Sequence, residues 1–225
     1  MTSREKYTAF FGRGADVVLD AKPDDPRSPS VYRFPPTRAG FLKRIFTPLA
    51  TDFVFMTDGM SSHAMPVPPE EQRVYPSRIE LFACARGAPV VGPEGRDVVT
   101  AILQGLAVVP FTQRIFFGPL HTCDLGEPVS SNPEMTGFLF AVPEGVDIAR
   151  LCSCTPAAEL VVSVIPVTAS EIRYAKAKGP DQLIAQFEKA ACSRCSILFE
   201  RESICPGREA RITCRRAIAR MRASA

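Results

Sequence analysis

The sequence of 225 residues predicts a single domain built around a mixed β-sheet that is flanked by helices. Hydrophobic residues make up 46% of the chain and charged residues 23%, which is typical of globular proteins that bury a core. The run 160–166 is apolar except for Ser163, and its length suits a buried strand. Segments of strand and helix character follow one another irregularly. This order favours a mixed sheet over the strict alternation of a parallel α/β fold.

The first half of the chain predicts two strands and one short helix. Residues 1–29 are rich in Pro and Asp, apart from an apolar stretch at 15–19, and they predict an N-terminal segment outside the domain. Residues 39–50 carry apolar side chains at helical spacing, although an internal proline argues against a long helix. Strands are predicted at 53–57, where four apolar residues follow one another, and at 77–85, where charged and apolar residues alternate.

The second half predicts a helix at 95–109 and strands at 135–142 and 160–166. Because side chains alternate along a strand, Leu160, Val162 and Val164 should share one face. Together with 53–57 and 79–84, the 160–165 strand is expected inside the sheet.

Two helices are predicted near the end of the domain. Ser170 can cap the first of them, and Gly179 followed by proline ends it. Asp181 can cap the second, over 182–190. The segment 111–120 is compatible with either a short helix or a strand.

The positive charge of the chain belongs to its C-terminal tail, residues 192–225. Eight arginines there stand against three glutamates, a balance of +5, so a chain of net charge +3 leaves residues 1–191 at −2. A nucleic-acid-binding domain would carry this charge on its folded surface, so nucleic acid is not the expected main ligand, except weakly through the tail. We expect the tail to be solvated and partly disordered.

The eight cysteines divide equally between the domain and the tail. The four in the domain are expected to be buried free thiols. The four in the tail begin with a C-x-x-C pair, Cys192 and Cys195, which is one half of a zinc site. Cys205 and Cys214 are too widely spaced to complete the usual pattern, so a zinc site is the lesser alternative.

No catalytic, metal or cofactor motif is found in the sequence. It has neither a G-x-S-x-G elbow nor a glycine-rich phosphate loop, and it has two histidines. Cys123 beside His121 offers a candidate nucleophile and base, which leaves a small hydrolase or thiol enzyme as the alternative function. The apolar runs are too short to cross a bilayer and the first residues carry charges of both signs, so we expect a cytoplasmic protein.

Three motifs, in order along the chain, resemble those of the suppressor-of-fused (SUFU) domain family, bacterial type. Thr57-Asp-Gly-Met-Ser61 resembles the Thr-x-Gly-Met-Ser turn of that family, and Arg78-Ile-Glu-Leu81 resembles its acidic strand. The stretch 162–179, with Glu171, is similar to a later motif of the family. The chain departs from the family in its lack of tryptophan and in its Cys- and Arg-rich end.

The resemblance implies an α+β domain with a mixed, largely antiparallel sheet over residues 30–191. It also implies a non-enzymatic domain that binds another protein, in the manner of bacterial immunity proteins that neutralise a toxin domain. The residues expected to take part in binding are those of the three motifs: Thr57, Gly59, Met60, Ser61, Glu80 and Glu171.

Truncation after Ala191 is expected to leave the thermal midpoint nearly unchanged. The tail carries too little apolar surface to offset the roughly 1–2 kcal/mol per residue that ordering a backbone costs. Thermal unfolding of the full and truncated chains checks this. A loss of many degrees, or stoichiometric zinc in the purified full chain, would show that the tail is part of the fold.

Overall fold

The structure, a computed structural model, describes the greater part of the chain before the tail. The described residues are 1–21, 28–36, 52–85, 97–129, 133–143, 146–155 and 157–189. The helix predicted at 39–50 and the tail at 192–225 lie outside them.

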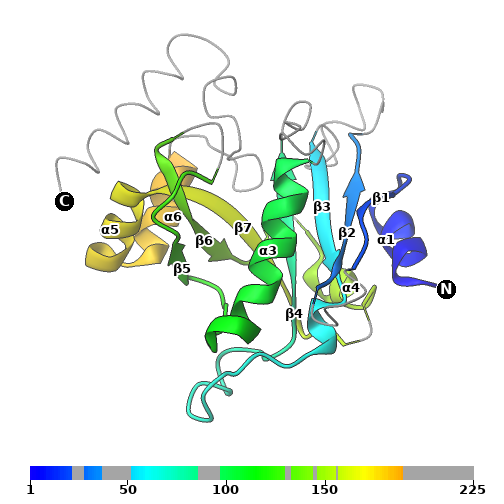
Figure 1. Cartoon of the computed structure of the whole chain (residues 1–225), viewed down its shortest axis with the longest axis horizontal. Coiled ribbons are helices and arrows are strands. Elements are labelled where there is room, and N and C mark those ends of the chain that lie inside the picture. Colours follow the sequence, from blue (N-terminus) through cyan, green and yellow to red (C-terminus); the bar gives the residue numbers. More distant parts are fainter. Residues whose placement is uncertain are drawn as a thin grey trace, which may run out of the picture.

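A seven-stranded mixed sheet forms the centre of the fold (Figure 1). Its spatial order is β1-β2-β3-β4-β7-β6-β5. The strands are β1 (Asp16–Leu19), β2 (Ser30–Phe34), β3 (Phe53–Asp58), β4 (Ile79–Ala85), β5 (Thr122–Asp124), β6 (Met135–Ala141) and β7 (Leu160–Thr168). Among the described pairs β4 and β7 run parallel and the others run antiparallel. The predicted α+β class with a mixed, largely antiparallel sheet is confirmed.

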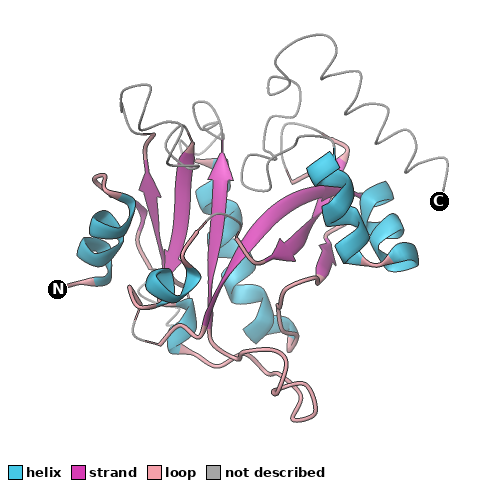
Figure 2. Ribbon diagram, turned by 180° about the vertical axis from the view of Figure 1, so that it is seen from behind, coloured by secondary structure: helices cyan, strands magenta, loops and turns pink. Residues whose placement is uncertain are grey.

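Helices cover both faces of this sheet, as the view from behind in Figure 2 shows. One face is covered by α3 (Val98–Gln113). The other is covered by α1 (Ser3–Phe11) and α4 (Ile148–Cys152) over one half, and by α5 (Ala169–Lys178) and α6 (Pro180–Lys189) over the other half.

Strand β7 shows how the side-chain period of two builds this arrangement. Val162 and Val164 are buried in the core beneath α3, and the half-buried Leu160 packs against the same core. Val161 and Ile165 point to the opposite face, where they join the two other clusters. Because each residue of β7 meets a helix on one side or the other, the strand is apolar almost throughout. The prediction that β3, β4 and β7 lie inside the sheet is confirmed.

Helix ends differ from the sequence prediction at three places. Asp181, predicted to cap the last helix, lies inside it, because α6 already begins at Pro180. The cap of α5 is Thr168 rather than Ser170, because the Thr168 hydroxyl accepts from the Glu171 amide while the Glu171 carboxylate accepts from the Thr168 amide. Helix α3 continues through Pro110 to Gln113, four residues past the predicted end. Pro110 is buried, so packing against the sheet keeps the helix going although the proline removes one hydrogen bond.

The N-terminal residues add to the domain that was predicted to begin at residue 30. Strand β1 pairs with β2 at the edge of the sheet, and α1 buries Tyr7 completely in the core. The Tyr7 hydroxyl forms a hydrogen bond with the Thr155 hydroxyl, which follows α4. Residues 3–19 are therefore packed elements of the same fold.

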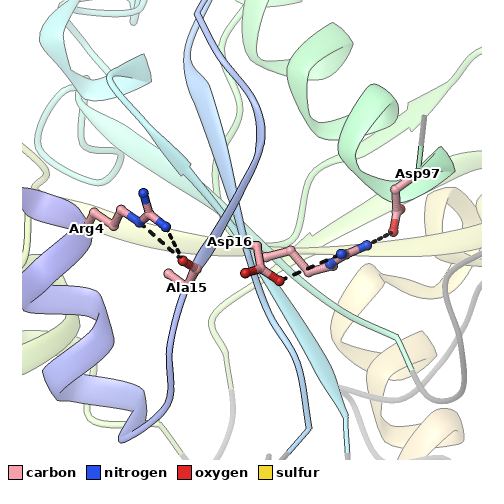
Figure 3. A network of polar contacts seen from close by, with 5 residues as sticks. Arg4, Ala15, Asp16 and Asp97 are labelled. Carbon is pink, nitrogen blue, oxygen red and sulfur yellow. Dashed lines mark hydrogen bonds and ion pairs between the residues drawn. The ribbon is translucent and has the colours of Figure 1, made fainter. Parts of the chain in front are cut away.

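Arg33 of β2 joins this edge to the N-terminal end of α3. Figure 3 labels its two acidic partners, Asp16 and Asp97. The Arg33 guanidinium lies 3.8 Å from a carboxylate oxygen of Asp16 in β1 and 3.6 Å from one of Asp97. The other oxygen of Asp97 caps α3 by accepting from the Val99 and Thr100 amides. Burial raises the pKa of Asp97, so the nearby guanidinium and the two amides offset only part of the cost of burying its charge.

Replacement of Gly137 by alanine is expected to destabilise the fold by about 1–3 kcal/mol. A side chain at Gly137 would meet the Cys123 carbonyl of the neighbouring strand and the Cδ1 of Ile172 in α5. The matched control is Gly105→Ala on the exposed side of α3, where a Cβ meets open space and should add about 0.5–1 kcal/mol of stability. Urea unfolding of both variants measures the difference, and similar effects at the two positions would contradict the packing described for β5, β6 and α5.

Candidate functional site

The buried carboxylate of Glu80 is the centre of the candidate site. Glu80 lies in β4 with none of its surface exposed to solvent. The hydroxyl groups of Thr57 and Ser61 donate to it at 2.5 and 2.6 Å. The backbone amides of Gly59 and Ser61 donate to it at 3.0 Å each. Four donors from one short segment thus converge on one side chain; we call these groups the Glu80 network.

The local sequence after β3 explains why these donors converge. Gly59 has a φ of 112°, which a residue with a side chain rarely adopts, so the chain can turn sharply there as predicted. The next residues, Met60–Ser62, form one 3-10 turn. The Thr57 hydroxyl also accepts from the Leu81 amide at 2.7 Å, so it links β3 to β4 in both directions. The turn is therefore folded around the carboxylate.

Burial dominates the electrostatics of Glu80. It raises the pKa of this carboxyl, although each of the four hydrogen bonds favours the charged form and lowers the pKa. No ion pair to Glu80 is present among the described residues. Its charged form is therefore stabilised by donors that carry no formal charge. The effect extends to Tyr7, whose pKa is raised first by its own burial and then by the charge of Glu80.

A second set of polar contacts closes the loop that follows the turn. Arg78, two residues before Glu80, donates through Nη1 to the carbonyls of Ser61 and Ser62, at 2.8 Å each. The Glu159 carboxylate accepts from the amides of Ser77 and Arg78 at 2.9 and 3.2 Å. These contacts hold together the two ends of the loop 62–78.

The structure brings together five of the six residues that were predicted to bind. Glu171 lies apart from them, because it caps α5. Gly59 is half-buried, and the other side chains of the set are buried: Thr57, Met60, Ser61, Glu80 and Glu171. Their observed contacts are internal, so a contact of these side chains with a partner stays a prediction.

His121 and Cys123 are the candidate base and nucleophile of the alternative enzymatic hypothesis, and each has its own surroundings. The His121 ring packs against the rings of Tyr75 and Phe116, with centroids 4.7 and 4.9 Å away. Burial raises the pKa of the Cys123 thiol, and Asp124 raises it further. A raised pKa lowers the thiolate fraction at neutral pH, which disfavours a nucleophilic role.

The thiols, acidic side chains and helices of the described residues bear on metal and membrane binding. Cys84, Cys123, Cys152 and Cys154 form no disulfide there, as predicted, but the prediction that all four are buried is wrong for Cys123 and Cys152, which are half-buried. In this part of the chain no cluster of three or more His, Cys, Asp or Glu side chains is placed to hold a metal ion. No helix within it is both long and apolar enough to cross a membrane. The four tail cysteines lie outside the described residues.

Sequence reasoning missed the residues that support the Glu80 network from outside. The sequence pattern predicts a strand at Arg78 and no role for Glu159. The first could have been suspected, because an arginine beside a buried acid often has a structural role. The contact between Glu159 and the start of β4 spans about eighty positions of sequence, which no local pattern reveals.

Comparison with known proteins adds a family and a fold. The family model described as "Suppressor of fused protein (SUFU)" matches residues 50–196. No curated protein matches this chain in sequence.

Three solved structures share the fold. A SUFU homologue from Neisseria gonorrhoeae FA 1090 has a TM-score of 0.58 at 12% identity, over 88% of this chain and 96% of that one. A Sufu–Fu complex gives 0.54 at 12% identity, over 82% of each chain. Drosophila Suppressor of Fused gives 0.59 at 11% identity, over 99% of this chain and 53% of that one.

Replacement of Glu80 by glutamine is expected to destabilise the fold by about 2–4 kcal/mol, because an amide nitrogen would face donors that need an acceptor. Glu159→Gln is the matched control, since the exposed Glu159 carboxylate also accepts from backbone amides. We expect its cost to stay below about 1 kcal/mol. Urea unfolding gives both values, and equal costs would contradict the central place of Glu80.

Comparison of the wild type with Glu80→Gln shows the direction of the shift in the pKa of Glu80. With a raised pKa, the folded chain holds the Glu80 proton more tightly than the unfolded chain does. The stability of the wild type relative to Glu80→Gln should therefore be greatest below the usual pKa of 4.5 and fall as the pH rises through the higher folded value. An advantage that grows with pH would show that the four hydrogen bonds outweigh burial.

Proposed function

We propose that this chain, which belongs to the Suppressor of fused protein (SUFU) family, is a non-enzymatic domain whose ligand is another protein. One structure with the same fold is a complex of Sufu with Fu, so this fold is found in a protein that associates with another. A ligand of this kind needs a rigid surface and no reacting groups.

The observation that carries the proposal is the internal use of the Glu80 network. The Thr57 and Ser61 hydroxyls donate to Glu80, and the side chains of all three residues are fully buried. A catalytic carboxylate or hydroxyl would have to reach a substrate. The turn is better explained as a scaffold that fixes the loops at this end of the sheet.

The six motif residues would then act in binding through the surface that they support. Thr57, Gly59, Ser61 and Glu80 hold the start of the loop 62–78, and Glu171 holds the start of α5. Their replacement would weaken the binding of a partner by loosening the surface that the partner contacts.

In its finer form, the proposal is an immunity-like protein of the cytoplasm that binds and neutralises a toxin domain. The net charge of −2 over residues 1–191 supports a cationic partner, because opposite charges speed encounter. This field is weak, so the docking surface itself must supply most of the specificity.

The experiment uses the full chain as bait in native cytosol, with Cys123→Ala as the matched variant. We expect both baits to recover the same protein partner, since the half-buried Cys123 thiol has no part in binding. Purified wild type should show no hydrolase activity. Repeated failure to recover a partner, together with a hydrolase activity that is lost in Cys123→Ala, would reverse the conclusion in favour of a thiol enzyme.

A further inference from the structure

Three exposed aliphatic residues adjoin, along the chain, three rings that contact one another. The rings of Tyr75, Phe116 and His121 contact one another, with centroids 4.7 to 5.3 Å apart. Each is directly preceded by an exposed aliphatic residue. The three aliphatic residues, with their exposed fractions, are Val74 at 72%, Ile115 at 37% and Leu120 at 43%. We call these six residues the Tyr75 patch.

The backbone beneath the patch is built and closely packed. The Tyr75 ring fills the space that a side chain at Gly118 would need. Arg114 and Leu120 both have positive φ, at 53° and 71°, and are the described non-glycine residues with this conformation. The Leu120 amide donates to the Phe140 carbonyl at 2.7 Å, which ties the loop to β6. Strained conformations persist where the surroundings enforce them, and they are common at functional sites.

The Tyr75 patch and the Glu80 network lie at the same end of the sheet. The loop 62–78 leaves the turn after β3 and returns to β4, at the lower end of the view in Figure 1, where α3 also ends. Arg78 and Glu159 hold the two ends of that loop, and the Met65 amide donates to the Ser77 carbonyl across it at 2.8 Å. These contacts therefore fix the loop that carries Val74 and Tyr75.

The charges beside the patch indicate what could cover it. Arg73 precedes Val74 and Arg114 precedes Ile115; both arginines are exposed and neither takes part in an ion pair among the described residues. Glu70 and Glu71 occupy the same turn as Arg73, so the rim on that side has both signs. The rim beside Ile115 carries the guanidinium of Arg114.

We propose that the Tyr75 patch docks a protein segment that places a bulky apolar side chain over Val74 and Ile115 and carboxylates against Arg73 and Arg114. This inference rests on the proposed protein-binding function and names its surface. An apolar centre with arginines at its edge is a common composition for a protein interface. Carboxylates on the segment would pair with guanidinium groups that the fold leaves open.

The test selects random short peptides, displayed on phage, against the full chain. The enriched peptides should combine aromatic or aliphatic residues with Asp or Glu. A synthetic copy of one should bind the double variant Val74→Asp, Ile115→Asp at least about tenfold more weakly than the wild type. Val142→Asp is the matched control, because Val142 is an equally simple exposed valine, 44% exposed, at the end of β6. It should leave the affinity unchanged. Circular dichroism confirms that each variant is folded.

Charge reversal tests the assigned chemistry. The double variant Arg73→Glu, Arg114→Glu should bind the peptide more weakly than the wild type does. The double variant Glu70→Lys, Glu71→Lys should bind it as tightly or more tightly. The opposite pattern, enrichment of basic peptides, or no enrichment at all would overturn the proposal.

Other occupants have their own readouts. A dimer that sedimentation detects and the double aspartate variant dissociates would assign the patch to a second copy of the chain. Patch-dependent binding to vesicles of phosphatidylcholine and phosphatidylserine would assign it to a membrane. Either result overturns the proposal. If a partner recovered from cytosol binds the double variant as tightly as the wild type, the Tyr75 patch is wrong although the protein-binding function stands.

Discussion

A fully buried carboxyl group, Glu80, whose oxygens accept from four hydrogen-bond donors, is the constraint on which one end of this fold depends. Removal of a carboxylate from water costs several kcal/mol unless its oxygens find partners. Here the partners are two hydroxyls and two backbone amides, all within Thr57–Ser61. Because the amides point at Glu80 only when Gly59 adopts a positive φ, the carboxylate and the shape of the turn require each other. A change in either partner leaves the other buried and unsatisfied.

This interdependence extends outward to the surface. The turn fixes the start of the loop 62–78, and the contacts of Arg78 and Glu159 fix its end. The loop carries Tyr75, whose ring packs against those of Phe116 and His121 in the segment between α3 and β5. Rigid support of this kind lowers the ordering cost that a docking surface would otherwise incur on association. The Glu80 network and the Tyr75 patch thus act together in the proposed binding, although among the six residues predicted to bind only Gly59 is not buried.

The sequence was informative where local pattern and tertiary environment agreed. The apolar runs at 53–57 and 160–166 became inner strands because each meets packed layers on both faces. Thr168 shows a signal that was available and misassigned, since Thr168-x-x-Glu171 is a capping box and Ser170 lacks an acid at the matching position. A similar box at Thr2 and Glu5 marks α1, which was not predicted. Pro110 lies inside α3 because burial there outweighs its local preference.

The candidate site divides in the same way. The turn and its acidic strand could be found from sequence as motifs, and the positive φ of Gly59 followed from glycine chemistry. The burial of these residues could not be predicted from sequence, because it comes from the packing of segments that are distant in sequence. The Tyr75 patch unites residues from two segments, the loop 62–78 before β4 and the residues 114–121 after α3, and its ring contacts exist only in the folded chain.

Hydrogen exchange at the Gly59 and Ser61 amides tests the central claim most directly. Both amides donate to Glu80 and to no strand partner, so their protection reports on that carboxylate alone. By NMR, the account predicts slow exchange in the wild type, comparable with that of the β4 amides. In Glu80→Gln, exchange at these two positions should accelerate at least about tenfold more than at the amides of β7. Fast exchange at Gly59 and Ser61 in the wild type, or protection that the substitution leaves unchanged, would contradict the claim that Glu80 organises the turn.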